Sequence, residues 1–80
     1  MTENEVRPKL GAVFCDIFDN DELRITDTTT AADVEGWDSL THVNLVVAVE
    51  KAFKISFTTK EISALKNVGE FVRLIARKSP

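Results

Sequence analysis

The sequence predicts an all-α fold of four helices, with a long loop after the first helix and a short third helix. Apolar residues recur at every third or fourth position on both sides of this loop, which is the spacing of one face of a helix. Two capping-box patterns, at 58–61 and 67–70, mark the starts of two further helices. Three glycines and two prolines among 80 residues supply too few turns for an all-β fold. We therefore expect the whole chain, 1–80, to form one small helical bundle.

The first predicted helix ends near Phe18, where the polar sequence DNDE begins. Its apolar stripe consists of Val6, Leu10, Val13, Phe14 and Ile17. Pro8 has no amide hydrogen, so we expect it in the first turn of the helix. With Asn4 as the cap the helix would begin at Glu5, whereas the restriction that a proline places on the residue before it equally favours a later start.

Residues 19–37 are predicted to form a long connection, because their threonines and aspartates bond to the local backbone in competition with a helix. Four apolar residues are spaced to hold this loop against a core: Leu23, Ile25, Val34 and Trp37. A structureless loop of this length is uncommon in so small a domain and is usually functional. The loop leads directly to Ser39.

The second helix is predicted from Ser39 to Phe53, with Asp38 or Ser39 as its N-cap. Its core stripe consists of Leu45, Val49, Ala52 and Phe53, flanked by His42 and Val46. A second apolar stripe lies on the opposite side, at Leu40, Val43 and Val47. With only three other helices available, the core cannot cover both stripes, so the second one favours a partner surface.

The short third helix is predicted from the box at 58–61 through Leu65, and the last helix from the box at 67–70 to about Arg77. Their inward faces consist of Ile62, Leu65, Val68, Phe71, Val72 and Ile75. The residues expected to meet in the core are Phe14, Leu45, Val49, Phe53, Phe57, Ile62, Leu65, Phe71 and Ile75.

Composition excludes several classes of protein. Hydrophobic residues are 44% and charged residues 29%, which is typical of a globular domain. No apolar run approaches the roughly 20 residues of a membrane helix, so we expect no membrane insertion. The N-terminal sequence MTENEVRPKL lacks the apolar stretch of a signal peptide, which predicts a cytoplasmic protein. The single cysteine, Cys15, excludes an internal disulfide and a cysteine-based metal site, and no metal site is expected.

The net charge of −3 is distributed unevenly along the chain. Residues 1–38 hold ten acidic and three basic residues, whereas residues 39–80 hold three acidic and seven basic residues. The basic residues form no uninterrupted patch, so binding to nucleic acid is not expected. Two solvated faces that attract each other explain the asymmetry.

Ser39 is the residue with the clearest potential for chemistry. A serine at the start of a helix is exposed, and the free amides and the dipole of the first turn favour an anion there. On local grounds alone, a simple capping role for Ser39 is the commoner one.

The sequence GWDSL at 36–40, the apolar helix that ends in Glu50 and Phe53, and the succession of helix lengths resemble an acyl carrier protein over nearly the whole chain. The resemblance implies that a phosphopantetheinyl transferase esterifies Ser39 with 4′-phosphopantetheine from coenzyme A. The thiol of this arm would carry acyl groups as thioesters to acyl-activating, condensing or acyl-transfer enzymes. It also implies a monomer that is not itself an enzyme.

A hydrolase is the alternative with chemistry of its own, because Asp38, Ser39 and His42 are the residue types of a catalytic triad. Nothing in the sequence indicates the strand, sharp turn and pocket that such a triad needs. We expect His42 to flank the core near the loop and Trp37 to anchor the loop. Cys15 is expected to be a half-exposed helix residue.

The second helix departs from the acidic pattern of carriers in fatty-acid synthesis. Thr41 stands two positions after the serine, Asn44 stands where an acidic residue is common, and the bases Lys51 and Lys54 follow. Only Asp38 and Glu50 are acidic along this helix. We therefore expect partners to bind the stripe of Leu40, Val43 and Val47, with a smaller electrostatic part from Asp38, Glu50 and the loop acids Asp33 and Glu35. This pattern favours a specialised acyl or polyketide pathway. The alternatives are an aminoacyl or peptidyl carrier, and an unmodified helical interaction module.

Overall fold

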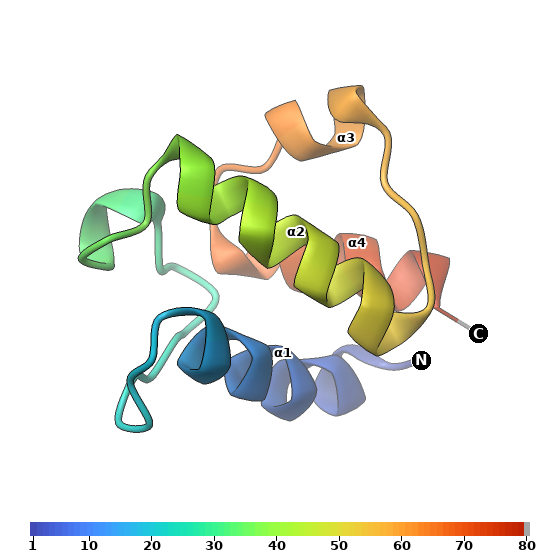
Figure 1. The fold of residues 1–80 in the computed structure, drawn as a ribbon. Helices are drawn as coiled ribbons and strands as arrows, with labels where there is room; N and C mark the ends of the chain where they lie inside the picture. The colour runs from blue at the N-terminus through green and yellow to red at the C-terminus, as the bar shows by residue number, and fades with distance from the viewer. Residues whose placement is uncertain (80) are drawn as a thin grey trace.

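The computed structural model describes residues 1–79, and within this range the chain is all-helical (Figure 1). The elements are α1 (Glu3–Ile17), the 3₁₀ turn η1 (Ala31–Asp33), α2 (Ser39–Phe53), α3 (Thr59–Ser63) and α4 (Val68–Lys78). The predicted fold class, with its long loop and short third helix, is confirmed. No helix of the described residues is long and apolar enough to cross a membrane.

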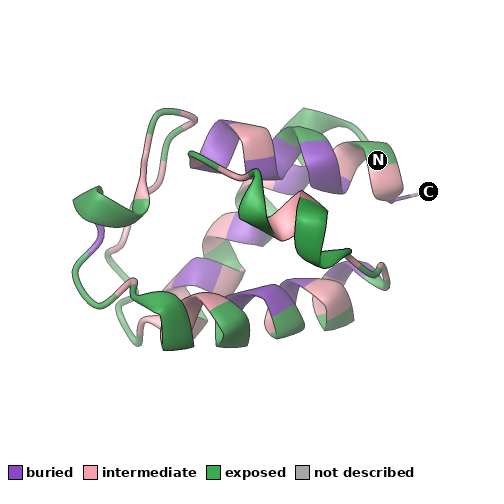
Figure 2. Cartoon of the chain, turned by 90° about the horizontal axis from the view of Figure 1, so that it is seen from above, coloured by how far each residue is buried: buried purple, intermediate pink, exposed green. Residues whose placement is uncertain are grey.

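Helix α1 packs against both α2 and α4, and α3 lies outside this layer, over α2 and α4 (Figure 1). The buried core between the helices consists of Val6, Leu10, Phe14, Leu45, Val49, Phe53, Val68, Phe71, Val72 and Ile75. In Figure 2 α3 carries no buried residue, whereas α2 and α4 alternate between buried and other residues. The two ends of the chain meet, since the Met1 ammonium group donates to the Ser79 carbonyl at 2.9 Å.

The start of α1 differs from both predicted starts. The helix begins at Glu3 because Thr2 and Glu5 form a capping box: the Glu5 amide donates to Thr2 Oγ1 at 3.2 Å, and the Thr2 amide donates to Glu5 Oε1 at 3.0 Å. Pro8 consequently lies in the second turn, so its predicted place in the first turn is wrong. The helix continues through Pro8 because the packing of Val6 and Leu10 on either side holds this segment against the core.

The long loop is more ordered than its composition predicts. At η1 the Thr30 amide and hydroxyl both donate to the Asp33 carboxylate, at 3.0 and 3.2 Å, so the loop is not wholly structureless. The four predicted anchors hold the loop as expected, with Val34 buried and Leu23, Ile25 and Trp37 packed against the core.

Two of the free amides at the start of α4 fix the loop in place. The Val68 amide donates to the Thr29 carbonyl and the Gly69 amide to the Asp27 carbonyl, both at 2.9 Å. The Arg7 guanidinium binds the Asp27 carboxylate through two nitrogens, at 3.0 and 2.8 Å, and lowers the pKa of Asp27. The loop between α1 and α2 is therefore hydrogen-bonded to both α1 and α4 before it reaches α2.

Replacing Gly69 with alanine should destabilise the protein, although alanine normally favours a helix by about 0.5–1 kcal/mol over glycine. A Cβ atom at Gly69 would lie 2.9 Å from the Asp27 carbonyl oxygen, and this backbone cannot move without losing its bond to α4. We expect a loss of about 1–3 kcal/mol in the free energy of unfolding, measured by denaturant titration. Gly11→Ala is the matched control, because nothing lies within 4 Å of its Cβ, and it should stabilise. Equal effects of the two changes would refute the close contact.

The predicted box at 58–61 is present, but four other predictions for this region need correction. Helix α3 ends at Ser63 instead of Leu65, and Ile62 lies outside the core because one short turn on the outside of the bundle buries little. Phe57 and Leu65 are only partly buried. The box at 67–70 is half formed: the Glu70 amide donates to Asn67 Oδ1, but the Glu70 carboxylate accepts from the Lys66 amide at 3.1 Å.

Candidate functional site

Ser39 is the first residue of α2 and is exposed. The N-cap is Asp38, whose carboxylate accepts from the Thr41 amide at 2.9 Å. This hydrogen bond lowers the pKa of Asp38, so the cap is ionised at neutral pH. The possibility that Ser39 is the N-cap is therefore wrong, and its hydroxyl is not used for capping.

The loop reaches Ser39 through a tight turn. Gly36 has a φ of +87°, a conformation that side chains with a Cβ rarely adopt. Around it, the Trp37 amide donates to the Val34 carbonyl at 3.2 Å and the Asp38 amide donates to the Gly36 carbonyl at 3.0 Å. After this turn Trp37 packs against the core, and Ser39 lies exposed at the start of α2.

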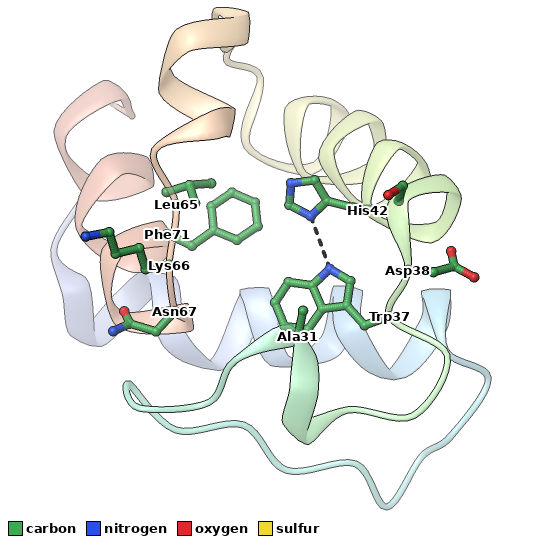
Figure 3. Close-up of a pocket in the computed structure, with 9 residues that line it drawn as sticks. Ala31, Trp37, Asp38, His42, Leu65, Lys66, Asn67 and Phe71 are labelled. Carbon is green, nitrogen blue, oxygen red and sulfur yellow. Dashed lines mark hydrogen bonds between the residues drawn. The ribbon is translucent and has the colours of Figure 1, made fainter.

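Trp37 anchors the end of the loop, as predicted. Its ring meets Phe14 edge-on with centroids 5.2 Å apart, meets Phe18 at 6.2 Å, and stacks on His42 at 6.0 Å. The indole Nε1–H donates to His42 Nδ1 at 3.1 Å (Figure 3). His42 therefore flanks the core beside the loop, which confirms its expected position.

This hydrogen bond excludes the triad geometry. An indole nitrogen can only donate, so His42 Nδ1 is the acceptor and the neutral ring carries its proton on Nε2. A catalytic histidine requires its Nδ1–H to donate to the acid, but here Asp38 accepts from the Thr41 amide instead. The three residue types are close in sequence and serve as cap, exposed hydroxyl and partner of Trp37.

Lowering the pH below about 6.5 should destabilise the fold through His42. Burial lowers the pKa of His42 from its ordinary value of 6.5, so the unfolded chain binds this proton more readily than the folded chain. The contribution of the neutral ring is complete above pH 6.5 and is lost as the pH falls through the lowered pKa of the folded state. The carboxyl groups with lowered pKa values have ordinary values of 3.8 to 4.5, so the interval from about pH 5 to 6.5 isolates His42.

Fluorescence of Trp37, the one tryptophan, provides the measurement during denaturant titrations at each pH. His42→Gln should remove most of the pH dependence in this interval, because glutamine can accept from Trp37 but does not titrate. An unchanged pH dependence in the variant would contradict the assignment to His42.

A hollow of ≈ 410 Å³ opens beside Ser39 (Figure 3). Its lining residues are Ala31, Trp37, Asp38, Ser39, His42, Leu65, Lys66, Asn67 and Phe71. The loop, α2 and the α3–α4 connection all contribute to it. Sequence reasoning missed Lys66 and Asn67 as neighbours of Ser39, because no local pattern relates the α3–α4 connection to the start of α2.

The other predicted site residues fall into two groups. Leu40, Val43 and Val47 lie exposed on α2, with exposed fractions of 74%, 58% and 42%, as the helical spacing predicts. Glu50 has a structural contact, since its carboxylate accepts from the Phe57 amide at 2.8 Å and fastens the segment after α2. Cys15 is half-buried on α1, where its thiol contacts the Leu23 carbonyl at 3.4 Å, away from the hollow.

The residues at this site suit the esterification of Ser39 by a phosphate-containing group. The hydroxyl is exposed at the start of a 15-residue helix, whose dipole favours negative charge. The adjoining hollow leaves space for an attached group. A helical bundle whose anchored loop presents such a serine is the arrangement expected of a small carrier domain.

Comparison with known proteins identifies the family. Residues 8–75 match the family model described as a phosphopantetheine attachment site. The chain is 30% identical to the acyl carrier protein of Guillardia theta, over 98% of this chain and 96% of that protein. The acyl carrier protein of Petrotoga mobilis is also 30% identical, over 98% and 92%. The solution NMR structure of a holo acyl carrier protein from Geobacter metallireducens superposes with a TM-score of 0.87 at 40% identity, covering 91% of this chain and 84% of that chain.

The chain belongs to the acyl carrier protein family. Members of this family are carriers and not enzymes, and the cofactor is covalently attached 4′-phosphopantetheine. This assignment sets aside the alternative of an unmodified interaction module. Partners of the family are transferases and acyl-processing enzymes.

Proposed function

We propose that Ser39 is the residue that carries 4′-phosphopantetheine, and that the chain presents acyl thioesters to the enzymes of a specialised acyl pathway. The observation that supports the attachment most strongly is the division of roles at the start of α2. Asp38 makes the capping bond, whereas the neighbouring hydroxyl of Ser39 is exposed and spared from it.

The position favours both the attachment and the movement of the arm. The dipole of α2 stabilises a phosphodiester at its first residue, and the loop that leads there is held by Trp37 and by the contacts of Asp27. When bound, the group supplies a thiol that carries the acyl chain as a thioester. An exposed attachment point allows a transferase to reach Ser39 and allows the arm to reach successive enzymes.

Intact-mass measurement tests the proposal. Incubation of the chain with a phosphopantetheinyl transferase and coenzyme A should add the mass of one arm. No mass gain with several different transferases would reject attachment at Ser39 as proposed.

The specialised pathway is proposed from the charge of α2. Asn44 is exposed where an acidic residue is common in a carrier for fatty-acid synthesis, and the exposed bases Lys51 and Lys54 follow it. Basic enzymes that recognise an acidic helix would gain little from this surface. Acyl-activating, condensing or acyl-transfer enzymes of a lipid, polyketide or other dedicated route fit it better.

The outer stripe of α2 is the proposed docking surface. Leu40, Val43 and Val47 are exposed on the helix that begins at Ser39, so a partner that covers them also approaches the arm. Apolar residues of this size left in water on one face favour burial against another protein. A smaller, electrostatic contribution to partner binding comes from four acidic residues: Asp38, Glu50, Asp33 and Glu35.

Val43→Ala and Val47→Ala should each lower kcat/KM of the modifying transferase by about 5- to 15-fold. This range corresponds to about 1–1.6 kcal/mol for the methyl groups removed from a buried contact. Glu50→Gln is the matched control, because glutamine removes the charge but keeps an oxygen to accept from the Phe57 amide. This variant should change kcat/KM by less than about twofold. The rate of modification of the parent protein should fall only mildly as the salt concentration rises.

The opposite ranking, with Glu50→Gln as the most damaging change and modification abolished by moderate salt, would indicate recognition of an acidic helix. It would also remove the argument for a specialised pathway.

An aminoacyl or peptidyl carrier is the second candidate, and the same shortage of acidic residues on α2 favours it over a carrier for fatty-acid synthesis. Mass spectrometry of the protein isolated from its native cells separates the two. An acyl thioester supports the first candidate, and an amino acid or peptide on the arm supports the second.

A further inference from the structure

His42 has a hydrogen-bond donor that the fold does not use. Because Nδ1 accepts from Trp37 at 3.1 Å, the proton of the neutral ring lies on Nε2. No hydrogen bond from this Nε2–H to another group is found within residues 1–79. In Figure 3 the second ring nitrogen is turned away from Trp37, toward the side of the hollow that carries Leu65. The donor therefore faces an open hollow beside Ser39, where an acceptor on a group attached at Ser39 can reach it.

The surroundings of this donor favour an uncharged acceptor. Leu65 and Phe71 make this part of the hollow apolar, and burial keeps His42 neutral by lowering its pKa. A phosphate oxygen at Nε2 would stabilise the imidazolium ion. That ion carries protons on both nitrogens and could not accept from Trp37. A carbonyl oxygen satisfies the donor and leaves the bond to Trp37 intact.

We propose that His42 is a positioning residue whose Nε2–H donates to an amide carbonyl oxygen of the phosphopantetheine arm and holds the arm along the hollow. The inference rests on the proposed attachment at Ser39. Both residues line the hollow, and they lie three positions apart on α2, on neighbouring turns of one face. The arm would rest against Leu65 until a partner draws it out, so its thiol would be shielded in the free protein.

The chain contains one histidine and one tryptophan, so each gives a single set of NMR signals. Intact mass first verifies that the arm is attached. In ¹⁵N-labelled protein, exchange of the His42 Nε2–H with water should be about tenfold slower in the holo form than in the apo form, which corresponds to a hydrogen bond of about 1.4 kcal/mol. The Trp37 indole N–H should exchange at the same rate in both forms.

Equal exchange of Nε2–H in apo and holo protein, with the arm present, would overturn the role of His42 and leave the attachment standing. A clear rise in the pKa of His42 on loading would also overturn it, because it would place the phosphate at Nε2. If no arm mass is found, the proposed attachment itself fails, and this inference fails with it.

Two variants provide an independent test by alkylation of the arm thiol with a neutral reagent. They are made in a Cys15→Ser background, so that the arm holds the one thiol present. His42→Phe retains a ring but neither hydrogen bond, and its thiol should react about five- to tenfold faster than that of the parent. His42→Gln retains an acceptor for Trp37 and an N–H donor, and should react within about twofold of the parent. Equal rates in all three proteins would overturn the proposal.

Discussion

Replacement of Ser39 by alanine is expected to abolish modification completely. The transferase needs the hydroxyl oxygen to form the phosphodiester, and the neighbouring hydroxyl of Thr41 is half-buried within the helix. Folding should be almost unaffected, within about 0.5 kcal/mol, because Ser39 is exposed and Asp38 makes the capping bond. Intact mass after incubation with transferase and coenzyme A, together with the denaturation midpoint, measures both parts.

Ser56→Ala and Ser63→Ala are the matched controls. Both serines are exposed, but neither stands at the start of a long helix. Each variant should gain one arm at the rate of the parent. A mass gain in Ser39→Ala that is lost when Ser56 or Ser63 is also replaced would move the attachment site and reject the division of roles between Asp38 and Ser39.

Phe14→Ala should produce the largest loss of stability among single changes in the core, about 3–5 kcal/mol. Phe14 is fully buried, stacks on Phe18 with centroids 5.8 Å apart and meets Trp37 edge-on at 5.2 Å. Typical stabilities of about 0.05–0.15 kcal/mol per residue make this a large share of the total for a small domain. The loss of its support should also raise the mobility of Trp37, so the wavelength of its fluorescence should shift toward that of exposed tryptophan before global unfolding.

Phe57→Ala is the control, since Phe57 is partly buried at the outer side of the bundle and contacts Phe71 with centroids 5.8 Å apart. It should lose less than half as much free energy of unfolding as Phe14→Ala in denaturant titrations followed by circular dichroism. Equal losses would contradict the outer position of the segment between α2 and α3.

Helix α2 was predictable because the residues that determine it are close together in the sequence. An apolar repeat on one side, a second one on the other and an N-cap candidate at the end of a polar loop predict its bounds, its buried Leu45 and Val49, and its exposed Val43 and Val47. The identity of Ser39 as the candidate site came from the motif at 36–40 and its resemblance to a family, since one serine at a helix start is not specific by itself.

The errors occur where two signals compete within one segment. The restriction imposed by Pro8 pointed to a late start for α1, but the reciprocal bonds of Thr2 and Glu5 begin the helix earlier. Ile62 has the spacing of a core residue, yet α3 is too short and too far out to bury it. Each local preference was real, and the packing of the whole chain decided between them.

The sequence alone predicted the helical class and the two faces of α2, because helical periodicity and capping act over only a few residues. The motif at 36–40 singled out Ser39 as the candidate site. Tertiary structure alone decided the Trp37–His42 bond, the contact of the loop with Gly69 and the hollow that joins Ser39 to Lys66. These features bring together residues from separate elements, and only the packing of α1, α2 and α4 sets the distances between them. No local spacing in the sequence encodes such distances, and they determine what surrounds Ser39.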